Sequence, residues 1–211
     1  MESNTIVKDT AILVIITLIV GFLLGAVNMV TKEPIAAAEQ KATNEAYAVV
    51  MENAEFSDSL TDIVSEAETK YTNAVILDCR EASKDGAVFG WVVKLNATKG
   101  YGGNVGLVIG FDTEGTITGF TVLSADKETP GLGANCTQES FTSQFTGKNA
   151  GDGNYTLYKA SDTKPEDMSA GIDAITSATI TSSAVTDAVN AANKFVREYC
   201  MTGNSEVSVD E

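Results

Sequence analysis

The chain has 211 residues, 29 of them acidic and 14 basic, and it contains no histidine. Without histidine, hydrolases built on a Ser-His-Asp or Cys-His pair are excluded, and the commonest ligands of zinc and haem are missing. A net charge of -15 without any cluster of Lys and Arg argues against binding to nucleic acid. The length suffices for one ordinary domain beside a membrane segment.

An uncharged and largely aliphatic run extends over residues 10–31. At about 1.5 Å per residue, a helix of this length crosses the roughly 30 Å of hydrocarbon in a bilayer. The run is too long for the core of a signal peptide, and its leader, residues 1–9, is not basic, so we expect a retained single-pass transmembrane helix. One lysine flanks each end, Lys8 and Lys32, so the flanking charges do not decide the orientation.

Residues 32–72 are expected to form a helical spacer. After Pro34, the stretch 35–51 is rich in the good helix formers Ala, Glu, Gln and Lys. A second short helix is expected over 59–69, with Asp58 or Ser59 as its N-cap. The folded domain then extends over 73–202, and the polar composition of residues 203–211 predicts a disordered tail.

Four runs rich in β-branched and aromatic residues predict strands over 74–79, 87–97, 104–111 and 116–124. The short connections at 84–86 and 112–115 contain Asp and Gly, which supply the positive φ of tight hairpins, so an antiparallel meander is expected. Trp91 lies in the middle of a run and is expected in the core.

Apolar residues then recur at three- and four-residue spacing and predict one helix over 183–199 that packs on the sheet. Strands followed by a helix, without βαβ alternation, indicate an α+β domain and not a doubly wound dinucleotide fold.

The three cysteines, Cys79, Cys136 and Cys200, are far apart and form no CxxC pair. This spacing fits neither a zinc ribbon nor an iron–sulfur cluster. Buried free thiols are the favoured interpretation, and a disulfide between Cys79 and Cys136 is the alternative.

Two glycine-rich segments are the first candidates for ligand binding. Glycines at this density let a backbone approach a flat or phosphorylated ligand closely, although each segment alone is also a common structural turn. The first is 100–103, with Tyr101 and Gly102, and the second is 128–133, with Glu128, Thr129, Pro130, Gly131, Leu132 and Gly133.

The third candidate is the segment 171–183, in which six of the eight residues from 176 to 183 bear hydroxyl groups just before the predicted helix. A helix start presents unpaired N–H groups and the positive end of the dipole, which suits a phosphate. Ser and Thr are also common N-caps, but one helix has one N-cap, so capping does not explain six hydroxyls.

The sequence from Asp173 to Thr179 resembles the Asp-x-x-Ser/Thr-Gly-Ala-Thr motif of FMN-binding domains in two related proteins, the G subunit of Rnf electron transport complexes and the C subunit of sodium-translocating NADH:quinone reductases. The two glycine-rich segments resemble the family's as well, in the same order, so the resemblance covers residues 100–199. It implies that a flavin transferase, using FAD and magnesium, esterifies Thr179 with the phosphate of FMN. It further implies that the phosphate contacts lie at Thr176, Ser177 and Ala178, that Asp173 belongs to the same cofactor-binding motif, and that the loops with Tyr101, Gly102 and residues 128–133 border the flavin.

Ser177 stands where the family usually has glycine, and this is the one departure from the motif. If the position requires a positive φ, attachment is expected to slow or to move to Thr181. Thr179 is the predicted acceptor.

The resemblance implies an electron-carrier protein, not itself catalytic, in a membrane complex that couples electron flow between reduced ferredoxin and NAD to sodium or proton transport. It places the leader in the cytoplasm and the domain outside it, and the short chain is closer to the Rnf protein than to the quinone-reductase protein. Two other classes stay open on the residues alone: a surface structural or adhesive protein without a cofactor, and a membrane-tethered module that binds a free phosphorylated ligand.

Overall fold

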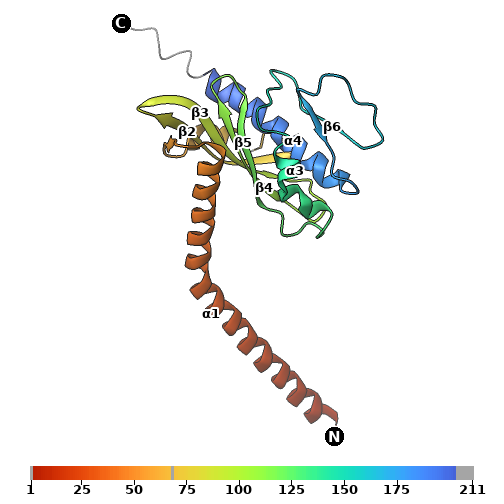
Figure 1. Ribbon diagram of the computed structural model, residues 1–211. Helices are drawn as coiled ribbons and strands as arrows, with labels where there is room; N and C mark the ends of the chain where they lie inside the picture. The colour runs from red at the N-terminus through yellow and green to blue at the C-terminus, as the bar shows by residue number, and fades with distance from the viewer. Residues whose placement is uncertain (1, 68, 203–211) are drawn as a thin grey trace. The chain divides into compact units, whose positions relative to one another are not determined.

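The computed structural model describes residues 2–67 and 69–202 (Figure 1). Glu68 and the predicted disordered tail, 203–211, lie outside the described residues. The chain divides into two compact units, residues 1–42 and 43–211, and each is described by itself.

The first unit consists of helix α1 (Glu2–Val50), which continues into the second unit. Apolar side chains along residues 12–30 are exposed, and α1 is long and apolar enough to cross a membrane, as the sequence predicts. The helix does not end before Pro34 but runs through it. Pro34 has no N–H to donate to the preceding turn, and the hydrogen bonds on either side of it keep the helix continuous.

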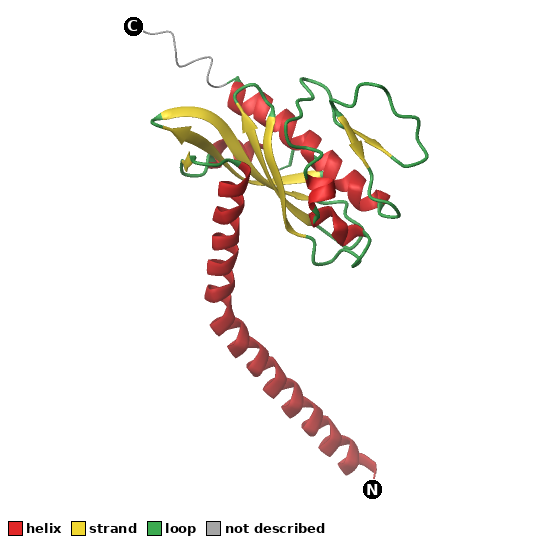
Figure 2. Ribbon diagram, viewed as in Figure 1, coloured by secondary structure: helices red, strands yellow, loops and turns green. Residues whose placement is uncertain are grey.

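The second unit is built on an antiparallel five-stranded sheet in the order β1-β2-β3-β4-β5 (Figure 2). The strands are β1 (Glu55–Phe56), β2 (Ala74–Lys84), β3 (Ala87–Ala97), β4 (Val105–Asp112) and β5 (Ile117–Ser124). The predicted meander is confirmed, while β2 continues past Cys79 and the short edge strand β1 was not expected.

Both predicted hairpin turns have the backbone that their residues favour. Between β2 and β3, Asp85 and Gly86 have φ values of 52° and 81°, as a two-residue turn of the primed type requires. Between β4 and β5, the Asp112 carboxylate accepts hydrogen bonds from the N–H groups of Glu114 and Thr116 at 2.9 and 2.8 Å, and Gly115 has a φ of 84°.

One face of the sheet is covered by α4 (Thr179–Phe195) and the π-helical η2 (Val196–Met201), as the predicted amphipathic helix requires (Figure 1). Trp91 is 2 % exposed and lies in this core, as expected. The predicted start at Ser183 was wrong, because α4 begins four residues earlier, at Thr179. Several of the clustered hydroxyls therefore belong to the first turns of the helix.

The opposite face of the sheet is covered by the end of α1. Tyr47, Val50 and Met51 are buried there against β2, β3 and β4. A side chain at Gly119 would collide with the backbone of Val50, so the glycine permits this close approach. The middle of the expected spacer, residues 32–72, is thus part of the domain core.

Asp78 anchors this end of α1 to β2. The Tyr47 hydroxyl and the Arg80 Nε each donate to its Oδ2 at 2.8 Å. Burial disfavours the charged form of Asp78, but hydrogen bonds from Ser59, Arg80 and Tyr47 outweigh burial and hold the pKa of Asp78 below its usual value.

Four further elements complete the unit near the start of α4, where the third motif lies. The sequence did not predict them. They are the 3-10 helix η1 (Gly133–Thr137), helix α3 (Glu139–Thr142) and a parallel pair of strands, β6 (Thr156–Tyr158) and β7 (Gly171–Asp173). Helix α2 (Thr61–Ala67) forms where a short helix was expected.

All three cysteines are buried and free, as the favoured interpretation expected. The alternative of a disulfide between Cys79 and Cys136 is wrong, because the Sγ of Cys79 lies 3.8 Å from that of Cys200.

Candidate functional site

A cavity of about 470 Å³ lies where the two glycine-rich segments meet the start of α4. This volume is within the roughly 300–1,000 Å³ of small-molecule sites. Its lining brings together three segments that are distant in the sequence: Tyr101, then Glu128, Thr129, Leu132 and Gly133, then Ser177, Ala178, Thr179, Ile180 and Thr181.

Most of the predicted site residues line this cavity, but some do not. Gly102 does not line it and donates its N–H to the Glu128 Oε1 at 3.1 Å. Asp173, Thr176 and Gly131 line a separate polar groove of about 420 Å³, and Pro130 is exposed and lines neither space. Ile180 was not predicted, although its position one residue after Thr179, at the start of a helix, was the available signal.

Helix α4 begins without a capping side chain. Its N-cap is Ala178, at φ -129° and ψ 41°, and no side chain caps the N–H groups of the first turn. The N–H groups of the first turn, at Thr179, Ile180 and Thr181, have no partner within the helix, and all three residues line the cavity. An uncapped helix start is a ready site for a phosphate.

The two candidate acceptor threonines differ in their surroundings. Thr181 is 1 % exposed, and its hydroxyl donates to the Glu128 Oε2 at 2.6 Å. Thr179 is half-buried on the cavity wall, and its hydroxyl makes no hydrogen bond to any residue in 2–67 or 69–202. Of these two hydroxyls, only that of Thr179 is accessible for chemistry.

Ser177 has a φ of 61°, in the left-handed region that favours glycine. The position therefore has the conformation that a glycine would adopt most easily. The loop that leads into α4 is held by Ser182, whose Oγ accepts from the N–H of Ile175 at 3.0 Å and donates to the carbonyl of Ala178 at 2.9 Å.

The glycines of the first two motifs surround the carboxylate of Glu128. A side chain at Gly100 would come within 2.7 Å of its Oε1, and one at Gly133 would collide with its Oε2. At Gly102 the obstacle would be the carbonyl of Lys127. The sequence suggested that these glycines admit a ligand, and in the structure they also make room for a buried carboxylate and its loop.

Glu128 is 4 % exposed, and its only hydrogen bonds within the described ranges are those from Gly102 and Thr181. No Lys or Arg in that part of the chain forms an ion pair with it. The carboxylate also acts on the neighbouring thiol of Cys136. Burial is the larger cause and the Glu128 carboxylate the second, and together they raise the pKa of Cys136 to about 11.

Three large apolar side chains stand exposed around the cavity, one from each motif. Tyr101 is 69 % exposed, Ile180 56 % and Leu132 40 %. An aromatic ring and aliphatic side chains above a phosphate site suit a ligand with a flat ring system at one end and a phosphate at the other.

Asp173 and Thr176 border the second groove, beside α3 and the loop before α4. The Asp173 carboxylate pairs with Lys164 Nζ at 2.7 Å, and its backbone N–H donates to the Gln144 side chain at 2.7 Å. Asp173 thus holds the motif loop in place, but it does not line the main cavity.

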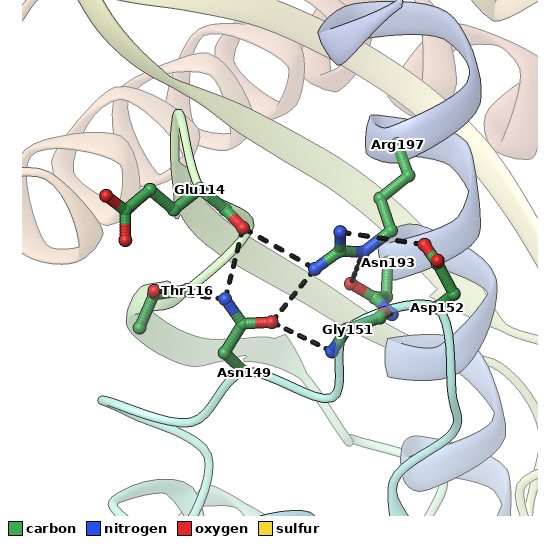
Figure 3. A network of polar contacts seen from close by, with 7 residues as sticks. All are labelled: Glu114, Thr116, Asn149, Gly151, Asp152, Asn193 and Arg197. Atoms are coloured by element: carbon green, nitrogen blue, oxygen red, sulfur yellow. Dashed lines mark hydrogen bonds and ion pairs between the residues drawn. The ribbon is translucent and has the colours of Figure 1, made fainter.

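A polar network at η2 holds the far end of the helical layer (Figure 3). Arg197 donates to the Asn149 Oδ1 at 2.9 Å and to the Asn193 Oδ1 at 3.3 Å, while Asn149 donates to the carbonyl of Glu114 at 3.1 Å. These contacts tie η2 to the β4–β5 turn.

Comparison with known proteins places the chain in a class. A family model described as an FMN-binding domain matches residues 100–194, and one described as the RnfG N-terminal region matches residues 1–50. The chain is therefore an FMN-binding-domain protein with the N-terminal region of the RnfG type.

The relatives define the family more closely. The chain is 34% identical over 198 residues to the G subunit of the proton-translocating ferredoxin:NAD(+) oxidoreductase complex of Clostridium ljungdahlii, across 94% of this chain and 95% of the relative. It is 30% identical over 201 residues to the G subunit of the ion-translocating oxidoreductase complex of Vibrio vulnificus, across 93% and 92%. The chain belongs to this family of G subunits, and α1 is its membrane anchor.

Among solved structures, NqrC of Shewanella oneidensis matches with 26% identity and a TM-score of 0.47, over 54% of this chain and 53% of that one.

Proposed function

We propose that this chain carries FMN bonded through its phosphate to the hydroxyl of Thr179 and passes electrons as part of a membrane-bound, ion-translocating oxidoreductase complex. The observation that carries the proposal is the uncapped start of α4, where unpaired N–H groups and the accessible hydroxyl of Thr179 line the same cavity. The match to the FMN-binding domain supports the choice of ligand.

The residues of the cavity fit the parts of FMN. The first-turn N–H groups and the helix dipole suit the phosphate, and the Thr179 Oγ suits the ester bond. Tyr101, Leu132 and Ile180 offer apolar contacts to the ring system. FMN supplies the capacity to take up and release electrons, while the protein supplies attachment, orientation and electrostatics, so no catalytic acid or base is needed.

Attachment at Thr179 requires a flavin transferase, in whose reaction the Thr179 oxygen replaces AMP at the flavin-side phosphorus of FAD and the hydroxyl proton is released. Thr181 is unsuitable as acceptor, because it is buried and its hydroxyl is engaged by Glu128. The left-handed backbone of Ser177 supports the same acceptor, since the conformation that the motif glycine would favour is already present.

The complex is proposed to be of the ferredoxin:NAD(+) oxidoreductase type named for the relatives, with its other subunits as partners. The folded domain is proposed to lie outside the cytoplasm. Covalent attachment suits this location, because FMN lost there could not be replaced from the cytoplasmic pool.

The full chain, coexpressed with a flavin transferase, tests the proposal by in-gel fluorescence after denaturing electrophoresis. We expect a fluorescent wild-type band, the same band for Thr181→Ala and no band for Thr179→Ala, with the mass of FMN on the Thr179 peptide. A dark wild-type band would refute the bond. Flavin that copurifies with the native chain but is lost on denaturation would indicate instead a module for a free phosphorylated ligand.

A further inference from the structure

We infer that Glu128 lowers the reduction potential of the flavin by keeping a negative charge buried in the wall of its cavity. The inference rests on the proposed function, since it concerns the flavin that Thr179 would hold. It assigns to the second glycine-rich motif an electrostatic role beyond that of a loop bordering the ligand.

The first step is that the charge is buried and is not neutralised by a cation. Glu128 is 4 % exposed and accepts hydrogen bonds only from the N–H of Gly102 and the hydroxyl of Thr181, among the parts of the chain that the structure describes. The described ion pairs do not include it. A carboxylate in such a place keeps a strong field, because burial holds it away from bulk solvent and none of the described Lys or Arg side chains pairs with it.

The second step is that the fold is built around this carboxylate. A Cβ at Gly133 would meet one of its oxygens, a Cβ at Gly100 would meet the Gly103 carbonyl and then the other oxygen, and a Cβ at Gly102 would meet the Lys127 carbonyl. Burying a carboxylate without a cation carries a desolvation cost that its two hydrogen bonds offset only in part. Neutral hydrogen-bonding groups would connect this loop to Gly102 and Thr181 equally well, without a buried charge.

The third step is proximity to the flavin. Glu128 and Thr179 line the same cavity, so a ligand that fills it while bonded to Thr179 lies beside the carboxylate. Reduction adds negative charge to the flavin, and a fixed negative charge nearby disfavours it. Removing the charge while keeping the shape of the side chain must therefore make reduction easier.

The test is a spectroelectrochemical titration, with dithionite as reductant, of the flavinylated full chain in detergent. We expect Glu128→Gln to shift the equilibrium toward reduced flavin at least tenfold, which is about 59 mV for a one-electron step. Glu128→Asp, which keeps the charge, is expected to stay close to the wild type. The matched control is Glu139→Gln, which removes the same charge from exposed α3 outside the cavity and is expected to leave the potential unchanged.

A wild-type potential in Glu128→Gln, or equal shifts in Glu128→Gln and Glu128→Asp, would overturn the inference. If Glu128→Gln does not fold, Thr129→Lys serves instead, because Thr129 is exposed, lines the cavity and would place a positive charge beside Glu128. It must also raise the potential, and no change there would equally count against the inference. Absence of attached flavin in the wild type would instead refute the proposed function, so the two failures are distinct.

Discussion

Replacing Thr181 with valine tests whether Glu128 depends on its hydrogen bond to this residue. The change keeps the side-chain shape but removes the donor to a buried carboxylate, at 2.6 Å. A hydrogen bond to a charged group contributes about 1.5–3 kcal/mol, so we expect Thr181→Val to lower the free energy of unfolding by about 2 kcal/mol. For a domain of this size, that is roughly 4–8 °C in Tm.

Thr186 provides the matched control on the same helix. It is 2 % exposed, and its hydroxyl donates to the carbonyl of Ser182 at 2.9 Å. That carbonyl also accepts the backbone N–H one turn later, so Thr186→Val leaves no buried group without a partner and is expected to cost less than about 1 kcal/mol.

The assay is thermal unfolding of the full chain in detergent, followed by the fluorescence of Trp91, the single tryptophan. Trp91 is buried in the core between the sheet and α4, so its emission reports unfolding of the domain. Equal Tm values for Thr181→Val and Thr186→Val would refute the reasoning, because they would mean that the Glu128 carboxylate gains nothing from Thr181.

Three further predictions concern other parts of the domain. Because the folded-state pKa of Asp78 is lowered, its contribution to stability is present above the unfolded-state pKa of about 3.9 and is lost as the pH falls through the folded value. Urea titrations should therefore show Asp78→Asn less stable than the wild type at pH 6, and the difference in stability should close below pH 4. Contact with Cys200 and then burial raise the pKa of Cys79, and burial raises the pKa of Cys136 to about 11. A thiol reagent at pH 8 should therefore leave these two cysteines unmodified in the native chain and modify three thiols after unfolding. Rapid modification of either one in the native chain would contradict this. Arg197→Ala should lower the free energy of unfolding by about 1–2 kcal/mol, because it releases Asn149 and Asn193. It should also speed hydrogen exchange of the backbone amides at 149–151. Unchanged exchange would show that the network in Figure 3 does not hold that loop.

The parts of the fold that depend on local chemistry were predictable from the sequence. The Asp85-Gly86 turn and the alternating runs beside it define the hairpin within a few residues. The apolar spacing of the last helix likewise predicts a packed face, which the structure confirms in α4.

The start of α4 was not predictable in the same way. Ser and Thr favour caps and turns when only neighbours are considered, so the hydroxyl run was interpreted as a segment before the helix. In the helix, the hydroxyl of Thr181 is bound by Glu128, which comes from a distant segment, while that of Ser182 is bound by the loop just before the helix.

The role of Glu128 was hidden for the same reason. Its hydrogen-bond partners lie 26 and 53 residues away in the sequence, and nothing near Glu128 signals that the carboxylate is buried. The position of Tyr47 and Val50 in the core was also missed, because the composition of the stretch 35–51 predicts only a helix and not which side it buries.

The left-handed backbone of Ser177 changes how the attachment motif should be compared between proteins. If the position selects a dihedral angle and not a residue type, then serine and asparagine are conservative replacements for glycine, while valine or isoleucine is not. Searches that demand glycine at this position would discard chains like this one, in which the loop before the proposed acceptor already has the conformation that the glycine would provide.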